Sequence, residues 1–305
     1  MGIDKVYDLI IVGAGPAGIT AAVYAARKGM DCLVLTVDIG GQAAWSSDIE
    51  NYTGYQLITG AELTAKFEEH MRKYGIDVRE NEAAEEVKKK DNVIHIKTGK
   101  ASYRAKAAII ASGKRSKELG VPGENDFKNK GLTYCATCDG PVFAGKDVAV
   151  IGGGNSALYA ALQLVKIANK VYIVNNLSEL GGDAVVRRKV TVGRNVVVMN
   201  SSEVEAVLGD TFVTGIRVKS GSQGKEIPVQ GVFVEIGLIP NSGFIKDVDK
   251  NKKEEIKVNC HNETNVSGIY AAGDVTDVPE KQIIIAAGEG AKAALTVFGY
   301  LARQG

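Results

Sequence analysis

The fold of this chain is decided by the stretch Gly13-Ala-Gly-Pro-Ala-Gly18. An apolar run at residues 6–12 leads directly into it, helix-forming residues follow at 17–28, and a second apolar run covers residues 32–35. A buried strand, a glycine turn, a helix and a second strand form the βαβ unit in which this fingerprint binds a dinucleotide. The stretch therefore predicts a dinucleotide site near the start of the chain.

Each glycine of the fingerprint lacks a side chain for its own reason. Gly13 permits the tight turn, Gly15 lets backbone N–H groups approach a pyrophosphate, and Gly18 lets the helix pack against the strand. The N-terminus of the helix then faces the anion. The acid that usually binds the ribose is missing, because Thr36 follows the second strand and Asp38 comes two residues late.

A second glycine turn, Gly152-Gly-Gly-Asn-Ser-Ala157, has the same surroundings. An apolar run at residues 146–151 precedes it, a helix is expected at 156–168, and a strand is expected at 171–174. The chain is therefore predicted to be an α/β protein with two Rossmann-like dinucleotide-binding domains.

Two linkers divide the chain. Residues 114–129 are polar and contain a proline and two glycines, and residues 238–241 form the second linker candidate. The segment after the second linker has too few strands for a domain of its own, so we expect it to return to the first. The second domain, residues 114–241, is then an insertion between residues 1–113 and 242–305.

Further strands are expected between these landmarks. In the first domain they are short and antiparallel at residues 76–78, 84–88, 93–98 and 101–105, with a separate buried strand at 107–113. In the second domain they cover residues 195–199, 203–208, 212–219 and 232–237. A strand at 268–275 and a helix at 283–300 close the chain.

The composition is that of a globular protein. Of 305 residues, 45% are hydrophobic and 24% charged, and 37 Lys and Arg against 36 Asp and Glu give a net charge of +1. No basic surface for nucleic acid or anionic lipid is indicated. The N-terminus shows no secretory signal, and no apolar run approaches the roughly 20 residues of a membrane span.

Two cysteines, Cys135 and Cys138, lie between the two glycine turns. A redox-capable dithiol in that position suggests electron flow from a nicotinamide through a flavin to a disulfide. A zinc half-site would need a second pair of Cys or His ligands at suitable spacing, which the sequence lacks. Cys32 and Cys260 are expected to be unpaired thiols. Four cysteines do not make a disulfide scaffold, so we expect a reducing, cytoplasmic location.

Asp139 follows the second cysteine directly and is the best proton carrier in the sequence. A thiol must lose its proton before it attacks a disulfide, and a neighbouring group must give and take that proton. The three histidines, His70, His95 and His261, stand in no recognisable motif. We interpret them as solvated or structural.

Several motifs together resemble those of the low-molecular-weight thioredoxin reductases and of the core of the flavoprotein component of alkyl hydroperoxide reductase. The resemblance covers essentially the whole chain, and the segment at 281–292 looks closest to the peroxide-system protein. The matching segments are residues 131–143, 148–157, 40–42, 50–52, 263–275 and 281–283.

The resemblance implies that the first domain binds FAD and that the inserted domain binds the nicotinamide dinucleotide. It implies that Cys138 faces the flavin, Cys135 attacks the partner disulfide and Asp139 moves the proton. The inserted domain of such enzymes rotates, and the two linkers fit hinges. The partner implied is thioredoxin or a similar small protein, and a homodimer is the family expectation. The FAD contacts implied are Gly13, Gly15, Ala17, Gly41, Gln42, Asn51, Gly273, Asp274, Gln282 and Ile283.

The second domain departs from the family where the 2′-phosphate of NADPH would be held. Reductases that use NADPH carry a His-Arg-Arg run and a later arginine there, whereas this chain has Asn175, Asn176, Leu177 and Gly181. We therefore predict NADH over NADPH, with Asn175 bonding a free ribose hydroxyl. The remaining dinucleotide contacts expected in this domain are Gly152, Gly154, Asn155 and Ser156.

Other functions stay open. The nearby Arg187 and Arg188 are interpreted as a solvated helix face rather than a displaced phosphate clamp. Because no residue is left to recognise the ribose phosphate, the electron donor could be ferredoxin or a deazaflavin. The chain could instead supply electrons to a peroxiredoxin system through a thioredoxin-like carrier. A nucleotide-binding module without turnover is a third class, which Cys135, Cys138 and Asp139 argue against.

Overall fold

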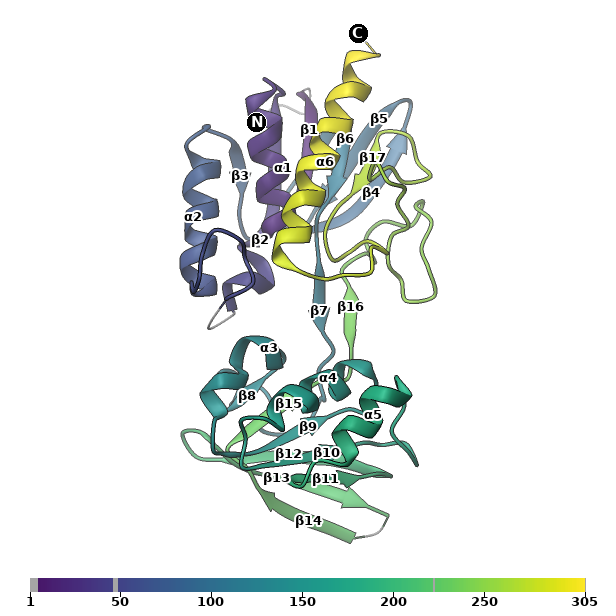
Figure 1. Cartoon of the computed structure of the whole chain (residues 1–305). Coiled ribbons are helices and arrows are strands. Elements are labelled where there is room, and N and C mark those ends of the chain that lie inside the picture. The colour runs from purple at the N-terminus through teal and green to yellow at the C-terminus, as the bar shows by residue number, and fades with distance from the viewer. Residues whose placement is uncertain (1–4, 46–48, 222, 305) are drawn as a thin grey trace. The chain divides into compact units, whose positions relative to one another are not determined.

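The computed structural model describes residues 5–45, 49–221 and 223–304, apart from the side chains of residues 45, 137, 138 and 223. The chain splits into two compact units (Figure 1). Unit 1 is Met1–Arg115 with Ile239–Gly305, and unit 2 is Ser116–Leu238. Two short strands at the boundary, β7 (Lys114–Ser116) and β16 (Leu238–Pro240), pair with each other.

Unit 1 is built on one mixed sheet with the order β3-β2-β1-β6-β5-β4, and β17 also pairs with β6. The strands that carry the first glycine turn are parallel, and β4, β5 and β6 form an antiparallel meander. The bounds are Val6–Ala14 (β1), Cys32–Ile39 (β2), Asp77–Arg79 (β3), Ala84–Lys90 (β4), Val93–Thr98 (β5), Ser102–Ile110 (β6) and Ile269–Ala271 (β17).

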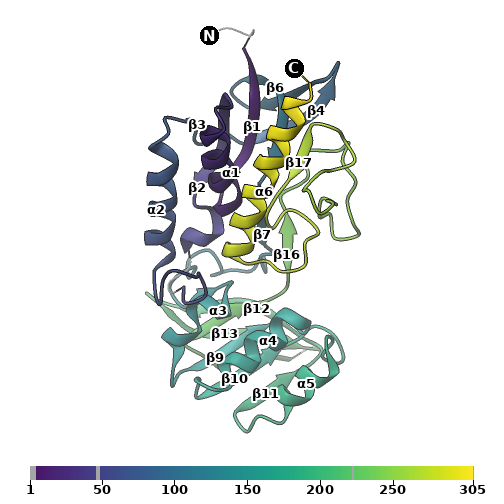
Figure 2. The same ribbon diagram turned by 45° about the horizontal axis from the view of Figure 1, so that its top comes forward.

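The long helices α1 (Pro16–Arg27) and α6 (Ile283–Ala302) lie side by side in unit 1, as both Figure 1 and Figure 2 show. Their backbones approach so closely that a Cβ on Gly290 would overlap the carbonyl oxygen of Ala17. Helix α2 (Gly60–Arg72) begins at a capping box in which the Thr59 and Glu62 side chains each bond the other residue's backbone N–H. The short turn η1 (Gly41–Trp45) follows β2.

Unit 2 contains a parallel sheet with the order β11-β10-β9-β15-β8 and a separate antiparallel sheet of β12, β13 and β14. The parallel strands are Leu132–Thr133 (β8), Asp147–Ile151 (β9), Lys170–Val174 (β10), Val196–Met199 (β11) and Gly231–Val234 (β15). The antiparallel strands are Ser202–Gly209 (β12), Val213–Ser220 (β13) and Gln223–Pro228 (β14). The helices are Ala136–Asp139 (α3), Gly140–Phe143 (η2), Asn155–Leu164 (α4) and Ala184–Thr191 (α5).

Fold class and most elements are confirmed, with three corrections. Residues 102–110 form one strand, β6, instead of two, because the strand pairs with β1 on both sides of residue 106, where the break was expected. The strand near residue 77 is parallel to β2, not antiparallel. Strands β7, β8, β14 and β16 were not expected from the sequence, and β7 and β16 lie in the two segments interpreted as linkers.

Within the described residues, one helix, α6, is long and apolar enough to cross a membrane by length and composition. The expectation that no segment approaches such a span was therefore wrong for α6. Its residues Ala293, Ala294 and Val297 lie in the core cluster shared with α1 and the sheet. Only 33% of the apolar stretch is buried in the structure, and a single such helix is weak evidence for a span, because the core helix of a soluble protein passes the same test.

Candidate functional site: two glycine turns and a disulfide

The first glycine turn joins β1 to α1 and leaves unfilled space beside Gly15. Gly13 has φ +106°, a conformation that favours glycine, and a Cβ on Gly18 would overlap the Gly13 carbonyl oxygen. Gly15 differs, because its φ of −77° suits any residue and a Cβ there would meet nothing within 4 Å. The space beside Gly15 at the start of α1 therefore fits the pyrophosphate of a dinucleotide.

Residues from distant parts of the chain meet around this turn. A Cβ on Gly41 would lie 3.5 Å from the Gly15 Cα, and one on Gly273 would lie 2.9 Å from the Ala17 Cβ. The Asn51 amide donates a hydrogen bond of 3.0 Å to Gln282, the residue before α6. Unit 1 thus brings six of the predicted FAD contacts together as three pairs. Those not yet placed are Gln42, whose amide bonds the Lys114 carbonyl, Ile283 at the start of α6, and Asp274 directly after Gly273.

A buried charge cluster accompanies Asp274. Burial raises the pKa of Asp274 above its ordinary value, although Lys281 and Lys114 oppose the shift. Burial and the charge of Lys114 lower the pKa of Lys281. Lys114 forms an ion pair with Glu255, and their side chains are only 7% and 10% exposed. Lys114 and Glu255 could not be predicted as a pair from the sequence, since only the fold brings residues so far apart together.

Thr36 performs a structural task where a ribose-binding acid is common. Its buried hydroxyl accepts a hydrogen bond of 3.1 Å from the Ala14 N–H and donates to the Asp38 carbonyl. The hydroxyl therefore ties the end of β2 to the first glycine turn.

The second glycine turn, in unit 2, leaves similar unfilled space beside Gly154. Gly152 has φ +133°, and a Cβ there would overlap the Glu235 carbonyl oxygen. Gly154, immediately before α4, has φ −89°, and a Cβ would again meet nothing within 4 Å. Asn155 accepts a hydrogen bond of 2.7 Å from the Asp183 N–H, and Ser156 is exposed on the first turn of α4.

Asn175 is buried beneath this turn and its amide is fully engaged. The Asn175 N–H groups bond the carbonyls of Leu177 (3.1 Å) and Glu179 (2.8 Å) and the side chain of Asn200 (3.0 Å). Its side-chain oxygen accepts from the Leu177 N–H at 3.3 Å. Asn175 therefore organises the loop after β10. Arg187 similarly donates to the Leu180 carbonyl at 2.7 Å, while Arg188 is exposed.

The disulfide site follows β8 at the carboxyl edge of the parallel sheet in unit 2. Cys135 is disulfide-bonded, and Cys32 and Cys260 are free. The side chain of Cys138 lies outside the described part of the structure. Thr133 links the two ends of the site, because its hydroxyl donates to the Asp139 carboxylate and accepts from the Cys135 N–H at 3.2 Å.

A buried carboxylate anchors the segment that precedes Cys135. Glu124 is 2% exposed and accepts hydrogen bonds of 2.7 Å from the Leu119 and Gly120 N–H groups. The Tyr134 hydroxyl donates to the same carboxylate at 2.8 Å. Burial, with this carboxylate, raises the pKa of Tyr134, so the phenol stays protonated and the anchor persists.

A second carboxyl, Glu235, faces the Cys135 segment from the end of β15. Its oxygen accepts a long hydrogen bond of 3.5 Å from the Ala136 N–H. Burial raises the pKa of Glu235 to about 7, and the Ala136 N–H only partly opposes that shift. Glu235 was not predicted as a site residue, although an acid inside the apolar run at residues 232–236 is a visible signal.

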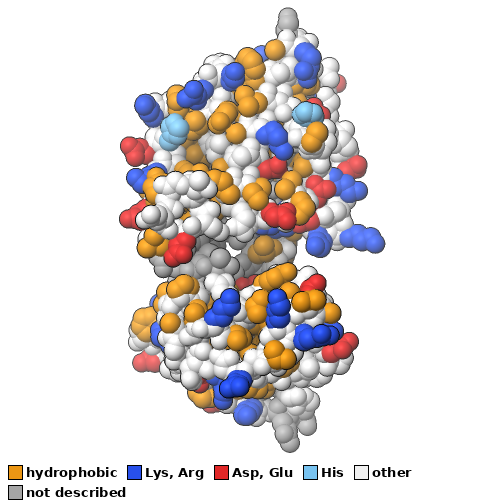
Figure 3. Space-filling view, in the orientation of Figure 1, with side chains coloured by type: hydrophobic (Ala, Val, Ile, Leu, Met, Phe, Trp, Pro, Cys, Tyr) orange, Lys and Arg blue, Asp and Glu red, His pale blue; other side chains and the backbone are white. Residues whose placement is uncertain are grey.

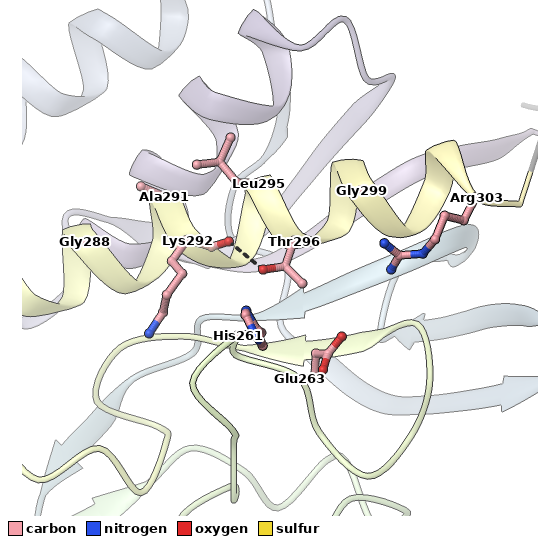
Figure 4. A pocket seen from close by; sticks show the side chains of 9 residues that line it. All are labelled: His261, Glu263, Gly288, Ala291, Lys292, Leu295, Thr296, Gly299 and Arg303. Carbon is pink, nitrogen blue, oxygen red and sulfur yellow. Dashed lines mark hydrogen bonds between the residues drawn. The ribbon is translucent and has the colours of Figure 1, made fainter.

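Other surface features contain none of the predicted site residues. Among the described residues, no group of three or more His, Cys, Asp or Glu could hold a metal ion. On the face in Figure 3, basic and acidic side chains are mixed over unit 1. A shallow pocket runs along α6 and the segment at 261–263 (Figure 4). Its lining residues are His261, Glu263, Gly288, Ala291, Lys292, Leu295, Thr296, Gly299 and Arg303.

A family model for pyridine nucleotide-disulphide oxidoreductases matches residues 7–290. The chain belongs to this family. Pyridine nucleotide-disulphide oxidoreductases of this kind are FAD-dependent and use NAD(P)H as electron donor. The unfilled spaces beside Gly15 and Gly154 fit the phosphates of two such dinucleotides.

Relatives within the family carry several names. An NADH dehydrogenase of Bacillus subtilis (strain 168) is 42% identical over 302 residues, which are 98% of this chain and 59% of that protein. The F component of alkyl hydroperoxide reductase of Staphylococcus aureus (strain MSSA476) is also 42% identical, over 98% of this chain and 60% of that protein. The chain thus spans about three fifths of the length of these relatives.

A solved structure matches the chain over nearly its whole length. The thioredoxin reductase from Streptococcus pyogenes MGAS5005 has a TM-score of 0.87 and 34% identity, covering 98% of this chain and 99% of that one. The two-unit dinucleotide-binding fold is therefore shown by a structure of similar length as well as by the family match.

Proposed function

We propose that this chain is a thioredoxin-disulfide reductase. Electrons pass from a reduced nicotinamide dinucleotide through FAD and the Cys135–Cys138 pair to the disulfide of thioredoxin or a similar small protein. The observation that carries the proposal is the disulfide at Cys135, tied through Thr133 to Asp139, in a unit with its own dinucleotide-type glycine turn.

In this proposal unit 1 holds FAD. Gly15 at the start of α1 would hold the pyrophosphate, and the pairs Ala17–Gly273 and Asn51–Gln282 would form the walls of the site. Bound FAD supplies two-electron chemistry between nicotinamide and disulfide. The proposed contacts are Gly13, Gly15, Ala17, Gly41, Gln42, Asn51, Gly273, Asp274, Gln282 and Ile283.

The dithiol then works by thiol–disulfide exchange. The Cys135 thiolate attacks one sulfur of the partner disulfide, which breaks and leaves a mixed disulfide and a partner thiolate. The Cys138 thiolate attacks the Cys135 sulfur, restores the internal disulfide and releases the second partner thiolate. Asp139, held by the Thr133 hydroxyl, carries a proton between cysteine and leaving thiolate. Two electrons and two protons thus reach the partner.

Unit 2 takes the nicotinamide dinucleotide at Gly152, Gly154, Asn155 and Ser156. NADH is proposed over NADPH, because the exposed Asn176 and Leu177 offer no positive charge to a 2′-phosphate. Asn175 stays a predicted contact, although its amide already holds the loop. Ferredoxin or a deazaflavin is the alternative donor.

A second candidate function is the reductase of a peroxiredoxin system. The 42% identity to the F component of alkyl hydroperoxide reductase favours it. In either case we propose a cytoplasmic homodimer that binds neither nucleic acid nor membrane.

The test is anaerobic reduction and turnover of the purified protein with FAD. NADH, NADPH, ferredoxin and a deazaflavin are compared at equal concentration by bleaching of the flavin band. Thioredoxin and a peroxiredoxin carrier are then compared as acceptors. The proposal expects NADH to reduce the flavin and thioredoxin to accept the electrons. A protein that stays colourless with FAD, or a flavin that cycles while no acceptor disulfide is reduced, would refute it.

A further inference from the structure

Glu235 lies between the second glycine turn and the disulfide site. Its backbone N–H donates a hydrogen bond of 2.8 Å to the Ile151 carbonyl, and its own carbonyl lies against Gly152. On the other side its carboxyl reaches the Ala136 N–H, next to Cys135. One acidic residue therefore contacts both halves of the site in unit 2.

Strand register explains this position. Strands β8 and β15 are parallel neighbours, and Phe233 pairs with Thr133. Two residues further along each chain come Glu235 and Cys135. Because both residues follow their strands at the carboxyl edge of the same sheet, Glu235 and Cys135 lie at neighbouring positions along that edge.

The surroundings of Glu235 hold little other charge. The glycine turn contributes no side chain at residues 152–154, and on the segment from β8 to α3 the titratable groups are Tyr134, Cys135, Cys138 and Asp139. The Tyr134 hydroxyl is taken by Glu124, and Asp139 accepts from Thr133. Burial keeps the pKa of Glu235 at about 7 while Cys135 is disulfide-bonded. This carboxyl therefore changes its protonation near neutral pH.

We propose that Glu235 and reduced Cys135 titrate as a coupled acid–thiol pair, in which the ionised carboxyl opposes ionisation of the thiol. The inference rests on the proposed dithiol function and deepens it. Once the carboxyl has ionised, its charge opposes formation of the thiolate.

The experiment measures the alkylation rate of Cys135 by iodoacetamide from pH 5 to 10. The protein is the full chain with Cys138→Ser and Cys260→Ser, reduced chemically, so that no donor or partner is needed. Cys32 is buried and burial raises the pKa of its thiol, so it stays unreactive. Glu235→Gln is compared with Glu235→Asp and with Glu203→Gln, a change at an exposed acid on β12.

A coupled pair predicts a specific shape for the pH profile of the Cys135 alkylation rate. In the protein that keeps Glu235, and in the Glu203→Gln control, the alkylation rate of Cys135 should rise with pH in two steps. In Glu235→Gln it should rise in one step, near the ordinary thiol pKa of about 8.5. A like charge raises a thiol pKa by about one unit, so Glu235→Gln should react about fivefold faster at pH 8.5 and equally fast below pH 6.5. Glu235→Asp should keep the second step. Coincident curves at every pH would overturn the pair and leave the thioredoxin assay of the proposed function untouched.

A second measurement needs no substitution at Glu235. The carboxyl carbon of Glu235 is followed by nuclear magnetic resonance in the reduced and oxidised wild-type chain. The pair predicts two titration steps when Cys135 is a thiol and one when it is disulfide-bonded. Identical titrations in both states would overturn it.

Discussion

Gly15 and Gly154 adopt the same backbone conformation in separate units. Their φ and ψ angles are −77° and −174° at Gly15 and −89° and −171° at Gly154. Each immediately precedes a helix, and a Cβ at either would meet nothing within 4 Å. Since these angles suit any residue, the missing side chain at each position is explained by a ligand rather than by the fold.

Valine at these two glycines should therefore separate the cofactors. We expect Gly15→Val to keep the fold and to weaken FAD binding about tenfold or more, a cost of about 1.4 kcal/mol or more. Gly154→Val should bind FAD normally and lose reduction by NADH. Flavin content, far-ultraviolet circular dichroism and stopped-flow reduction measure these effects. Normal FAD content in Gly15→Val would refute the assignment of unit 1.

Thr133→Val should slow the dithiol chemistry without touching the flavin. The hydroxyl holds both Asp139 and the Cys135 N–H, and loss of such bonds costs about 1–2 kcal/mol, or roughly five- to thirtyfold in rate. Steady-state thioredoxin reduction measures the loss, and flavin reduction by the donor should be unchanged. The exposed Thr214→Val serves as control, and equal turnover in both variants would contradict the role of Thr133.

Glu235 should make the oxidised protein less stable as pH rises. Its pKa of about 7 in the folded state exceeds the ordinary value of 4.5, so the folded state binds more protons between these values. The free energy of unfolding should therefore fall between about pH 4.5 and pH 7, by about 3 kcal/mol. Denaturant unfolding at pH 5 and pH 8 checks this. Glu235→Gln should remove the fall, and an unchanged pH dependence would show that the carboxyl titrates normally.

Arginine at Asn176 and Leu177 should shift donor use toward NADPH. Both side chains are exposed on the loop after β10, so the substitutions should leave the fold intact. A 2′-phosphate paired with arginine gains about 1.4 kcal/mol or more, which lowers the KM for NADPH about tenfold. KM values for both dinucleotides provide the test. If the double variant gained no affinity for NADPH, this loop would not be the ribose site.

The glycine turns, the two βαβ units and their order were predictable from sequence because each is a local pattern. Strand β14 escaped prediction because residues 223–228 carry lysine, glutamate, glycine and proline instead of an apolar alternation. The sequence pattern favours two strands where the structure has β6, since this strand pairs with the solvent-facing meander at one end and enters the core at the other.

Within the candidate site, contacts between residues far apart in the sequence could not be predicted. The role of Asn175 under the loop depends on Asn200, which lies on the far side of α5 in sequence. The position of Glu235 beside Cys135 depends on the register of β8 and β15, two strands far apart in the chain, which no local pattern encodes.

The most direct test of the account is disulfide reduction by Cys138→Ser, compared with wild type under anaerobic conditions. The account predicts a yellow protein whose flavin is still reduced by the donor but whose thioredoxin turnover falls about a hundredfold or more, since the internal disulfide can no longer form. Wild-type turnover in this variant would contradict it, because electrons would then reach the partner without the pair.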